Sequence, residues 1–475
     1  MTSAHHLVLQ YRWKVVYVEG KPHLLYYGVR NPPLHREVLL PLSKSLARVL
    51  ESKGMMENSD VHEIKDLVIR KVLVPPEEKR SAKTPQTMQT CTNCVVNDYV
   101  VPGLEFDDHG VCALCQCYEK AEPGGYSAFP KVTEEELRSM AGKTSGSRFD
   151  AMVLYTGGKD SSFMLWLLAR KLGLRVLAAF WDMPYCTGAA YTNIDRARQT
   201  MPEVEFVRWA LPWNTLRKGM LAKWRSHGWP CMCPSPAFAL FYPMAARLRI
   251  PHVFLGIEDV QAAVLDHVVG PASNAAAPLT PREQTLRFLG IRALPGSQKQ
   301  PLRWPDEMTN YHAAVRDAMP EVFHELADLV QLAGKDTSMH IPLVARLATN
   351  ESYGTWKNSQ EIIQREMGWM PPEGQNNLLH TSCRLEPVKD YLQFQRFKAM
   401  RTVFMPQSMV ELGAAVAFGL TPRSEALIAS QELGYWQTPQ ELAGLARDLG
   451  IDARAVEDSS DELRHSMAEW AGLSS

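Results

Sequence analysis

The segment Tyr155–Ser162 reads Tyr-Thr-Gly-Gly-Lys-Asp-Ser-Ser and has the composition of a phosphate-binding loop. Two adjacent glycines let the backbone turn sharply and approach a phosphate with no side chain in the way. A helix starting there would add free N–H groups and a partial positive charge. Thr156 and Ser161 add hydroxyl donors, Lys159 can neutralise phosphate charge, and Asp160 can hold magnesium or cap the helix. The full string favours nucleotide binding over a plain strand–turn–helix connection.

Four of the nine cysteines form two C-x-x-C pairs with 17 residues between them. Each pair bends the chain so that both thiolates can face one ion, which predicts a tetrahedral zinc site made by Cys91, Cys94, Cys112 and Cys115. Four thiolates fill the coordination sphere, so we expect a structural role for this zinc. Cys117 is either a spare thiol or a replacement for Cys115.

A second set of thiols consists of Cys231, Cys233, Cys383 and, as a further candidate, Cys186. Three thiolates could hold three irons of a [4Fe–4S] cluster and leave one iron open to bind sulfide. They could equally serve as persulfide-carrying nucleophiles. The alternative is that these are ordinary buried small residues, since free cysteine is frequently buried.

The elements that must position these residues follow an alternating pattern from Phe149 onward. Short apolar runs predict strands at 151–155, 175–181, 204–209 and 252–255. Helical periodicity or composition predicts helices at 163–172, 192–200 and 237–248. Repeated strand–helix units of this kind predict an α/β fold with an open parallel sheet and helices on both faces. In such sheets, ligands bind at the carboxyl ends of the strands.

The loop from Thr156 to Ser161 resembles the S-G-G-x-D-S loop of the PP-loop ATP pyrophosphatases, with threonine in place of the first serine. This resemblance implies an adenine nucleotide alpha hydrolase-like fold that uses ATP and magnesium. AMP is then transferred to a carbonyl or carboxyl oxygen, pyrophosphate leaves, and a nitrogen or sulfur nucleophile displaces AMP. The nucleotide-binding residues it implies are Thr156, Gly157, Gly158, Lys159, Asp160, Ser161, Ser162, Asp182, Gly256 and Gln261. The catalytic candidates are Lys159, Asp160, Cys231, Cys233 and Cys383.

From Cys91 to about residue 450, the chain resembles the N-acetyl sugar amidotransferase group of PP-loop enzymes. The resemblance rests on the phosphate loop and on three further segments, namely Phe106–Cys112, Met367-Gly368-Trp369 and Gly419–Leu427. It implies ammonia supplied by a partner glutaminase. The later cysteines depart from that group and instead resemble the tRNA 2-thiolation branch, which combines a zinc module, a G-G-K-D-S loop and three later cysteines.

The chain divides into several expected regions. Residues 1–74 predict a small α/β module of winged-helix or peptide-recognition type, with a helical face at Leu42, Leu46, Val49 and Leu50 and a returning strand at 67–74. The polar residues 75–90 predict a linker. The remaining regions are a zinc module at 91–118, the PP-loop domain at 149–385 and a helical C-terminal region at 386–475.

The amino-acid composition excludes few classes of protein. Of 475 residues, 45% are hydrophobic and 22% charged, and the net charge of −1 gives no global reason to expect nucleic acid or a membrane surface as partner. No apolar run approaches the roughly 18 residues of a membrane span. The first residues lack the layout of a secretory signal, so we expect a cytoplasmic protein.

Three functions remain open at this point. One is sulfur transfer to an adenylated peptide or small molecule, with tRNA less favoured because the charge balance is near neutral. The second is an ATP-dependent amidotransferase working with a glutaminase. The third is a non-catalytic protein in which nucleotide and zinc organise an interaction surface. The helical tail could form a homodimer surface or a packed lid.

Overall fold

The computed structural model describes residues 6–18, 20–52, 56–57, 62–119, 131–140, 146–258, 260–261, 279–295, 312–347, 354–373, 379, 382–435 and 437–451. The chain forms two compact units. We call the described parts of 1–120 and 393–417 the N-terminal unit. We call the described parts of 121–299, 310–392 and 418–475 the sheet unit.

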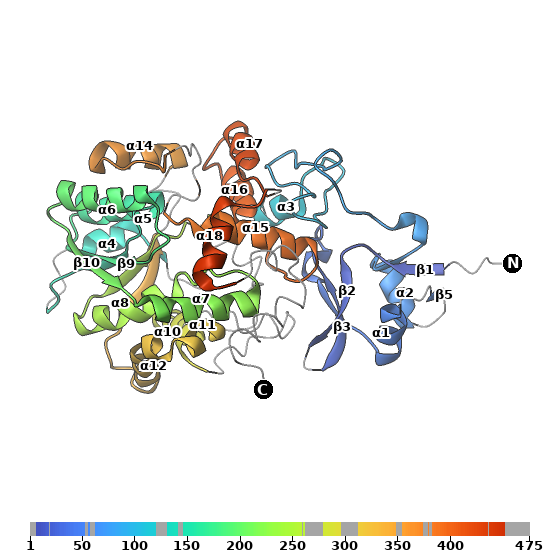
Figure 1. Ribbon diagram of the computed structural model, residues 1–475, viewed down its shortest axis with the longest axis horizontal. Helices are drawn as coiled ribbons and strands as arrows, with labels where there is room; N and C mark the ends of the chain where they lie inside the picture. Colours follow the sequence, from blue (N-terminus) through green and yellow to red (C-terminus); the bar gives the residue numbers. More distant parts are fainter. Residues whose placement is uncertain are drawn as a thin grey trace. The chain divides into compact units, whose positions relative to one another are not determined.

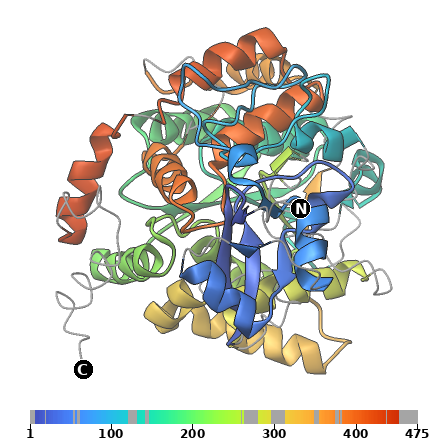
Figure 2. The same cartoon turned by 90° about the vertical axis from the view of Figure 1, so that its right-hand side faces the viewer.

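The N-terminal unit begins with two small antiparallel sheets (Figure 2). In one, β3 (Lys21–Tyr26) pairs with β2 (Trp13–Val18) and β4 (Leu39–Pro41). In the other, β1 (His6–Leu9) pairs with β5 (Met56–Glu57) and β6 (Leu73–Val74). Helices α1 (Lys44–Glu51) and α2 (His62–Ile69) share a buried core with both sheets.

The strand expected at 67–74 is wrong for most of its length. Residues up to Ile69 belong to α2, and the chain then turns at Lys71, whose φ is +55°. Only Leu73 and Val74 are strand. Arg70 and Lys71 interrupt the apolar residues of this segment. Leu67 and Leu73, on either side of that break, face the same core, and such short apolar runs do not reveal their period.

The rest of this unit holds the cysteine-rich segment. Residues 79–89 are exposed, which fits their polar composition. Helix α3 (Ala113–Glu119) packs against α16 (Gln407–Ala417). A Cβ on Gly413 of α16 would lie 2.3 Å from a methyl carbon of Val96, so the helix approaches the cysteine segment closely only because residue 413 has no side chain.

A parallel sheet forms the centre of the sheet unit. Its strand order is β10-β9-β8-β11-β12-β7, and each neighbouring pair is parallel. The strands are β7 (Lys131–Val132), β8 (Ala151–Leu154), β9 (Val176–Asp182), β10 (Glu205–Ala210), β11 (His252–Leu255) and β12 (Leu343–Leu347). All of β8 is buried, as expected for an apolar strand between two helix layers. The predicted α/β class with a parallel sheet is confirmed.

Helices cover both faces of this sheet (Figure 1). One layer contains α4 (Glu134–Met140), α5 (Lys159–Trp166), α6 (Gly188–Thr200) and α14 (Trp356–Met367). The other contains α7 (Trp213–His227), α8 (Ser235–Arg247), α10 (Pro281–Ala293), α11 (Ala313–Ala318) and α12 (Pro320–Lys335). Three further helices, which belong wholly or partly to this unit, follow as α15 (Leu385–Lys398), α17 (Arg423–Glu432) and α18 (Gln440–Leu449).

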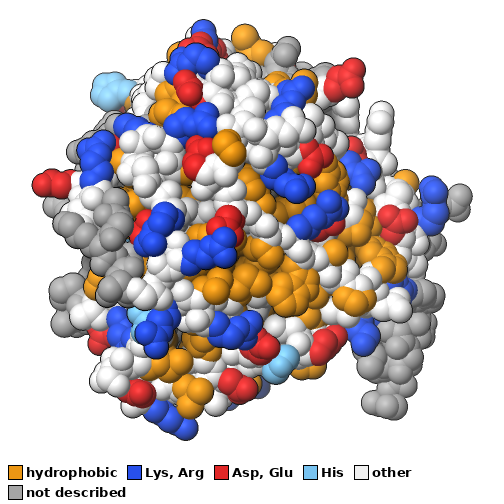
Figure 3. All heavy atoms as spheres, turned by 90° about the vertical axis from the view of Figure 1, so that its left-hand side faces the viewer, with side chains coloured by type: hydrophobic (Ala, Val, Ile, Leu, Met, Phe, Trp, Pro, Cys, Tyr) orange, Lys and Arg blue, Asp and Glu red, His pale blue; other side chains and the backbone are white. Residues whose placement is uncertain are grey.

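The edge strand β10 is much more exposed than its neighbours, and the side chain of Trp209 is 41% exposed. The molecular face in Figure 3 has hydrophobic side chains near its middle, interspersed with lysine and arginine. Among the helices that the structure describes, none is both long and apolar enough to cross a membrane.

Candidate functional site

The phosphate-loop candidate connects β8 to α5, as the sequence predicts. Gly157 adopts a φ of +72°, and Gly158 is the N-cap residue of α5. The Thr156 and Ser161 hydroxyls lie 3.0 Å apart, and the Thr156 backbone N–H donates to the Ser161 hydroxyl at 3.2 Å. These hydrogen bonds therefore close the loop at the start of α5. An anion binds well at the free N–H groups of a helix start.

Gly157 is enclosed by groups from distant parts of the chain. A Cβ there would lie 2.4 Å from the carbonyl oxygen of Ala190 in the first turn of α6. Its own carbonyl accepts hydrogen bonds from the Asn193 side chain and the Trp369 indole, both at 3.0 Å. Gly368, with a φ of +63°, ends α14 and turns the chain so that Trp369 reaches the loop. Sequence reasoning assigned no role to Asn193 or Trp369, although it singled out the segment containing Trp369.

Gly256, predicted to contact the nucleotide, packs against the first turn of α5. A Cβ on Gly256 would lie 2.9 Å from the backbone nitrogen of Ser161, so the glycine permits β11 to end against the loop. Gln261 lies further along, where its side-chain oxygen accepts the backbone N–H of Glu258 at 3.2 Å. Gln261 thus shapes the chain after β11.

Lys159 is 4% exposed and lies among carboxylates. Its ammonium donates to Asp160 and, at 3.1 Å, to Glu258. Glu258 also accepts the Trp356 indole N–H at 2.6 Å, and the Lys159 ammonium lies 5.0 Å from the centre of the Trp356 ring. Sequence reasoning missed Glu258 and Trp356. The position of Glu258 after a predicted strand was the available signal for it.

Burial determines the protonation of this cluster. It raises the pKa of Glu258 from its ordinary value of 4.5 to about 8, against the attraction of Lys159. Burial acts to lower the pKa of Lys159, but the charges of Asp160 and Glu258 outweigh it and raise that pKa. Burial therefore favours the protonated form of Glu258.

Asp182 ends β9 at the same edge of the sheet. Its carboxylate accepts the Tyr191 hydroxyl at 2.7 Å and the Arg208 guanidinium at 2.8 Å. These bonds fix the chain where β9 leaves the sheet. The nucleotide contact predicted for Asp182 stays a prediction.

In the N-terminal unit, four buried thiols lie close together. The sulfur atoms of Cys91, Cys94, Cys112 and Cys115 all lie within 4.8 Å of one another, and those of Cys94 and Cys112 are 3.7 Å apart. Four sulfurs bound tetrahedrally at about 2.3 Å from one zinc ion lie about 3.8 Å apart. Ligands on separate irons of a cluster would be more widely spaced. The four-cysteine group fits a single tetrahedral ion, and Cys117 lies outside it.

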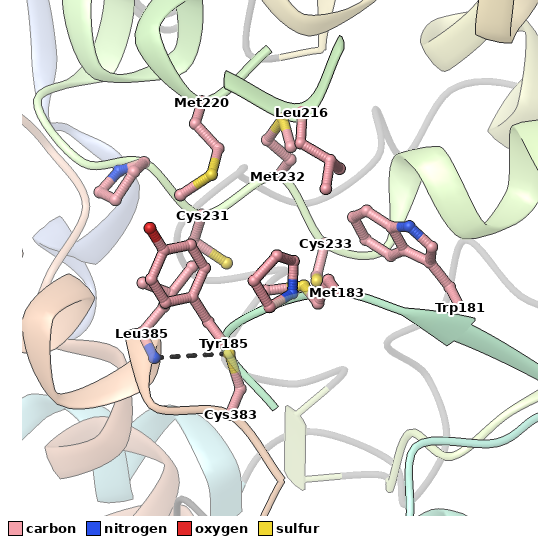
Figure 4. A pocket seen from close by; sticks show the side chains of 12 residues that line it. Trp181, Met183, Tyr185, Leu216, Met220, Cys231, Met232, Cys233, Cys383 and Leu385 are labelled. Carbon is pink, nitrogen blue, oxygen red and sulfur yellow. Dashed lines mark hydrogen bonds between the residues drawn. The ribbon is translucent and has the colours of Figure 1, made fainter. Parts of the chain in front are cut away.

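Three of the other predicted thiols, Cys231, Cys233 and Cys383, line a pocket in the sheet unit (Figure 4). Cys231 and Cys233 precede α8, and Cys383 comes from the segment before α15. The backbones of Cys383 and Cys186 form an isolated antiparallel β-bridge, and both thiols are free. The sulfur of Cys383 accepts the backbone N–H of Leu385 at 3.4 Å. The structure therefore brings all four candidate residues to one region, with Cys186 beside the pocket.

Two of the pocket thiols differ in acidity. A hydrogen bond from Cys233 lowers the pKa of Cys231 to about 6. The same interaction raises the pKa of Cys233. Among the described residues, Cys231, Cys233 and Cys383 do not form a group with all sulfurs within 4.8 Å. Their spacing thus suits separate irons or separate reactive thiols better than one shared ion.

The first turn of α6 connects the thiols to the phosphate loop. Thr187, its N-cap residue, donates its backbone N–H to the carbonyl of Ser382, next to Cys383, at 3.0 Å. Three residues later, the backbone of Ala190 packs against Gly157. Both sites therefore lie at the carboxyl edge of the sheet, on the same turn of one helix.

Comparison with known proteins adds one structural match. No protein-family model and no curated protein sequence matches the chain. Among solved structures, the chain is similar to the U34-tRNA thiolase NcsA from Methanococcus maripaludis with its [4Fe–4S] cluster, at 11% identity and a TM-score of 0.21. The match covers 61% of this chain and 94% of that chain.

Proposed function

We propose that this protein is an ATP-dependent sulfurtransferase of PP-loop type. The observation that supports it is the first turn of α6, which contacts a phosphate-type loop at Gly157 and the segment of Cys383 at Thr187. An activating nucleotide and a sulfur-bearing group would then meet at one sheet edge. The non-catalytic alternative explains the loop but not the convergence of thiols beside it.

In the first step, a carbonyl or carboxyl oxygen of the substrate attacks the α-phosphorus of ATP. The bond from that phosphorus to the bridging oxygen breaks, and pyrophosphate leaves with the electron pair. The loop from Thr156 to Ser162 would hold the phosphates through its N–H and hydroxyl donors, which stabilise the charge developing on pyrophosphate. Asp160 would hold magnesium. The ammonium of Lys159 would balance the negative charge of the Asp160 carboxylate.

In the second step, for a carboxylate substrate, hydrosulfide attacks the activated carbon and AMP leaves, giving a thiocarboxylate without any oxidation. If a cysteine persulfide delivers the sulfur, a second cysteine must release the product by forming a disulfide with the first. The pocket offers several thiols for either route. A [4Fe–4S] cluster held by Cys231, Cys233 and Cys383 would supply an open iron for sulfide. The four-cysteine group of the N-terminal unit would hold zinc and stabilise the fold.

The test is metal and acid-labile sulfide content after anaerobic purification, together with an absorption spectrum. We expect zinc plus about four iron and four sulfide per chain, the stoichiometry of a [4Fe–4S] cluster. The Cys383→Ala variant should lose iron and sulfide but keep zinc, whereas Cys117→Ser should keep all three. Zinc alone, with a product that incorporates ammonia in place of sulfur, would replace this proposal by the amidotransferase reaction.

A further inference from the structure

Cys186 and Cys383 lie opposite each other in the isolated β-bridge of the sheet unit. The residues on either side of them exchange two backbone hydrogen bonds, which run from Thr187 to Ser382 at 3.0 Å and from Arg384 to Tyr185 at 2.8 Å. An antiparallel pair that is flanked in this way is a non-hydrogen-bonded pair, the kind in which the two Cα atoms approach most closely. The bridge therefore brings the two cysteines together by their backbones.

This geometry is the one that a disulfide needs. The Cα atoms of a non-hydrogen-bonded pair lie about 4.5 Å apart, and the two side chains share one face of the bridge. A disulfide joins residues whose Cα atoms are about 4.4 to 6.8 Å apart. The backbones of Cys186 and Cys383 can thus be cross-linked without displacement of either segment. Both thiols are free and only partly buried, so a small oxidant or reductant can reach them.

The two cysteines differ in their relation to the pocket. Cys383 belongs to its lining and is one of the thiols assigned above to sulfur transfer or to a cluster (Figure 4). Cys186 is not among the described residues that line it. The thiolate is the form of cysteine that binds a metal and acts as a nucleophile. A disulfide to Cys186 would therefore prevent Cys383 from binding iron or carrying a persulfide.

We propose that Cys186 and Cys383 form a reversible disulfide under oxidising conditions, which removes Cys383 from sulfur chemistry and makes the pair a redox switch of the site. Its effect on the reaction rests on the proposed function, whereas the disulfide itself does not. The oxidant is a small-molecule disulfide.

The switch closes in two exchange steps. One cysteine thiolate attacks the S–S bond of the oxidant, which gives a mixed disulfide and releases one small thiolate. The second cysteine thiolate attacks the protein sulfur of that mixed disulfide and releases the other small thiolate. The two released thiolates take up the two protons that the cysteines have lost. Two cysteines are thereby oxidised, the oxidant is reduced to two thiols, and a dithiol reverses both steps.

The test treats the full-length chain, purified in air and reduced beforehand, with oxidised glutathione. Burial raises the pKa of both thiols and only thiolates attack, so the exchange is followed over hours. The products are digested with trypsin and analysed by mass spectrometry. Cys186, Cys383 and the Cys231–Cys233 pair lie on separate tryptic peptides, residues 176–196, 366–384 and 226–247. We expect the first two peptides to become joined and dithiothreitol to separate them. Unjoined peptides, or Cys383 joined to 226–247, would overturn the inference.

A double variant tests the bridge geometry while the number of thiols stays the same. Ser382→Cys/Cys383→Ser moves the thiol by one position, and successive side chains of an extended segment point to opposite faces. This variant should lose most of the cross-link to Cys186. Cys117→Ser, on α3 of the N-terminal unit, should form the cross-link as the unchanged chain does. Equal cross-linking in the double variant would contradict the assignment to the bridge.

A preparation that contains iron and sulfide separates this inference from the proposed function. If Cys383 binds iron, the anaerobically purified chain should form the cross-link severalfold more slowly than the chain purified in air. Equal rates, with the expected peptides joined in both preparations, would support the disulfide and contradict the role of Cys383 as an iron ligand.

Discussion

The ammonium of Lys159 lies 3.1 Å from a carboxylate oxygen of Glu258, and both side chains are almost fully buried. The pair joins the helix after the phosphate loop to the end of β11, so it fixes the loop against the sheet. A buried hydrogen-bonded pair of this kind is costly to break from one side, because the remaining polar group is left without its partner.

This pair predicts a pH-dependent stability. The unfolded Glu258 carboxyl releases its proton near pH 4.5 and the folded one near pH 8. Between these values the folded state holds a proton that the unfolded state has lost, so the contribution of this group to the free energy of unfolding falls as pH rises. In Glu258→Gln this decline should disappear, as measured by urea unfolding from pH 5 to pH 8. The exposed Glu325, paired with Arg247, is the control, and Glu325→Gln should leave the profile unchanged.

Gly157→Ala should abolish MgATP binding and destabilise the protein. Gly157 combines a φ of +72° with a Cβ position 2.4 Å from the Ala190 carbonyl oxygen. Gly173 has a similar φ of +68°, but a Cβ there would meet nothing within 4 Å. Gly173→Ala should therefore cost only the backbone strain of about 1 kcal/mol, and Gly157→Ala about 1–3 kcal/mol more. Equal losses of unfolding free energy would contradict the steric argument.

The Trp369 indole predicts a loop-ordering effect. Trp369→Phe removes the hydrogen bond to the Gly157 carbonyl and should cost about 1 kcal/mol of stability. It should also raise the Kd for MgATP severalfold, measured by calorimetry. Trp166 packs on the same core, and in the described residues its indole N–H has no acceptor. Trp166→Phe should thus leave the MgATP affinity unchanged, and a comparable loss in both variants would refute a role for the hydrogen bond.

The four-cysteine group predicts one tightly held zinc ion per chain. Cys112→Ser should release zinc, measured by elemental analysis, and should lower the thermal stability of the N-terminal unit, because binding to the thiolates contributes directly to folding. Cys117 is also buried and lies on α3 with Cys115, but outside the group. Cys117→Ser should retain zinc, and its loss there would show that the ligand set is wrongly assigned.

Local signals in the sequence were sufficient to predict the parallel sheet, the phosphate-type loop and the grouping of the two C-x-x-C pairs. Each of these depends on residues that are neighbours in the chain. The glycines at 157 and 158 come shortly after the buried strand β8, which ends at Leu154, and the spacing within each cysteine pair is set by one tight turn. The run at 67–74 shows the limit of such signals, because helix and strand alternatives of a short apolar run look alike.

The sequence by itself determined which thiols and hydroxyls are available for chemistry. Only the tertiary structure decided their surroundings. In the folded chain, Glu258 accepts hydrogen bonds from Lys159 and from Trp356, and Trp369 donates to the Gly157 carbonyl. The backbones of Cys186 and Cys383, which are 197 positions apart by the difference of their numbers, form a β-bridge. The physical reason is that the carboxyl ends of parallel strands meet at one sheet edge, whatever the length of chain between them. The contacts made there depend on packing between distant segments, and no local periodicity encodes them.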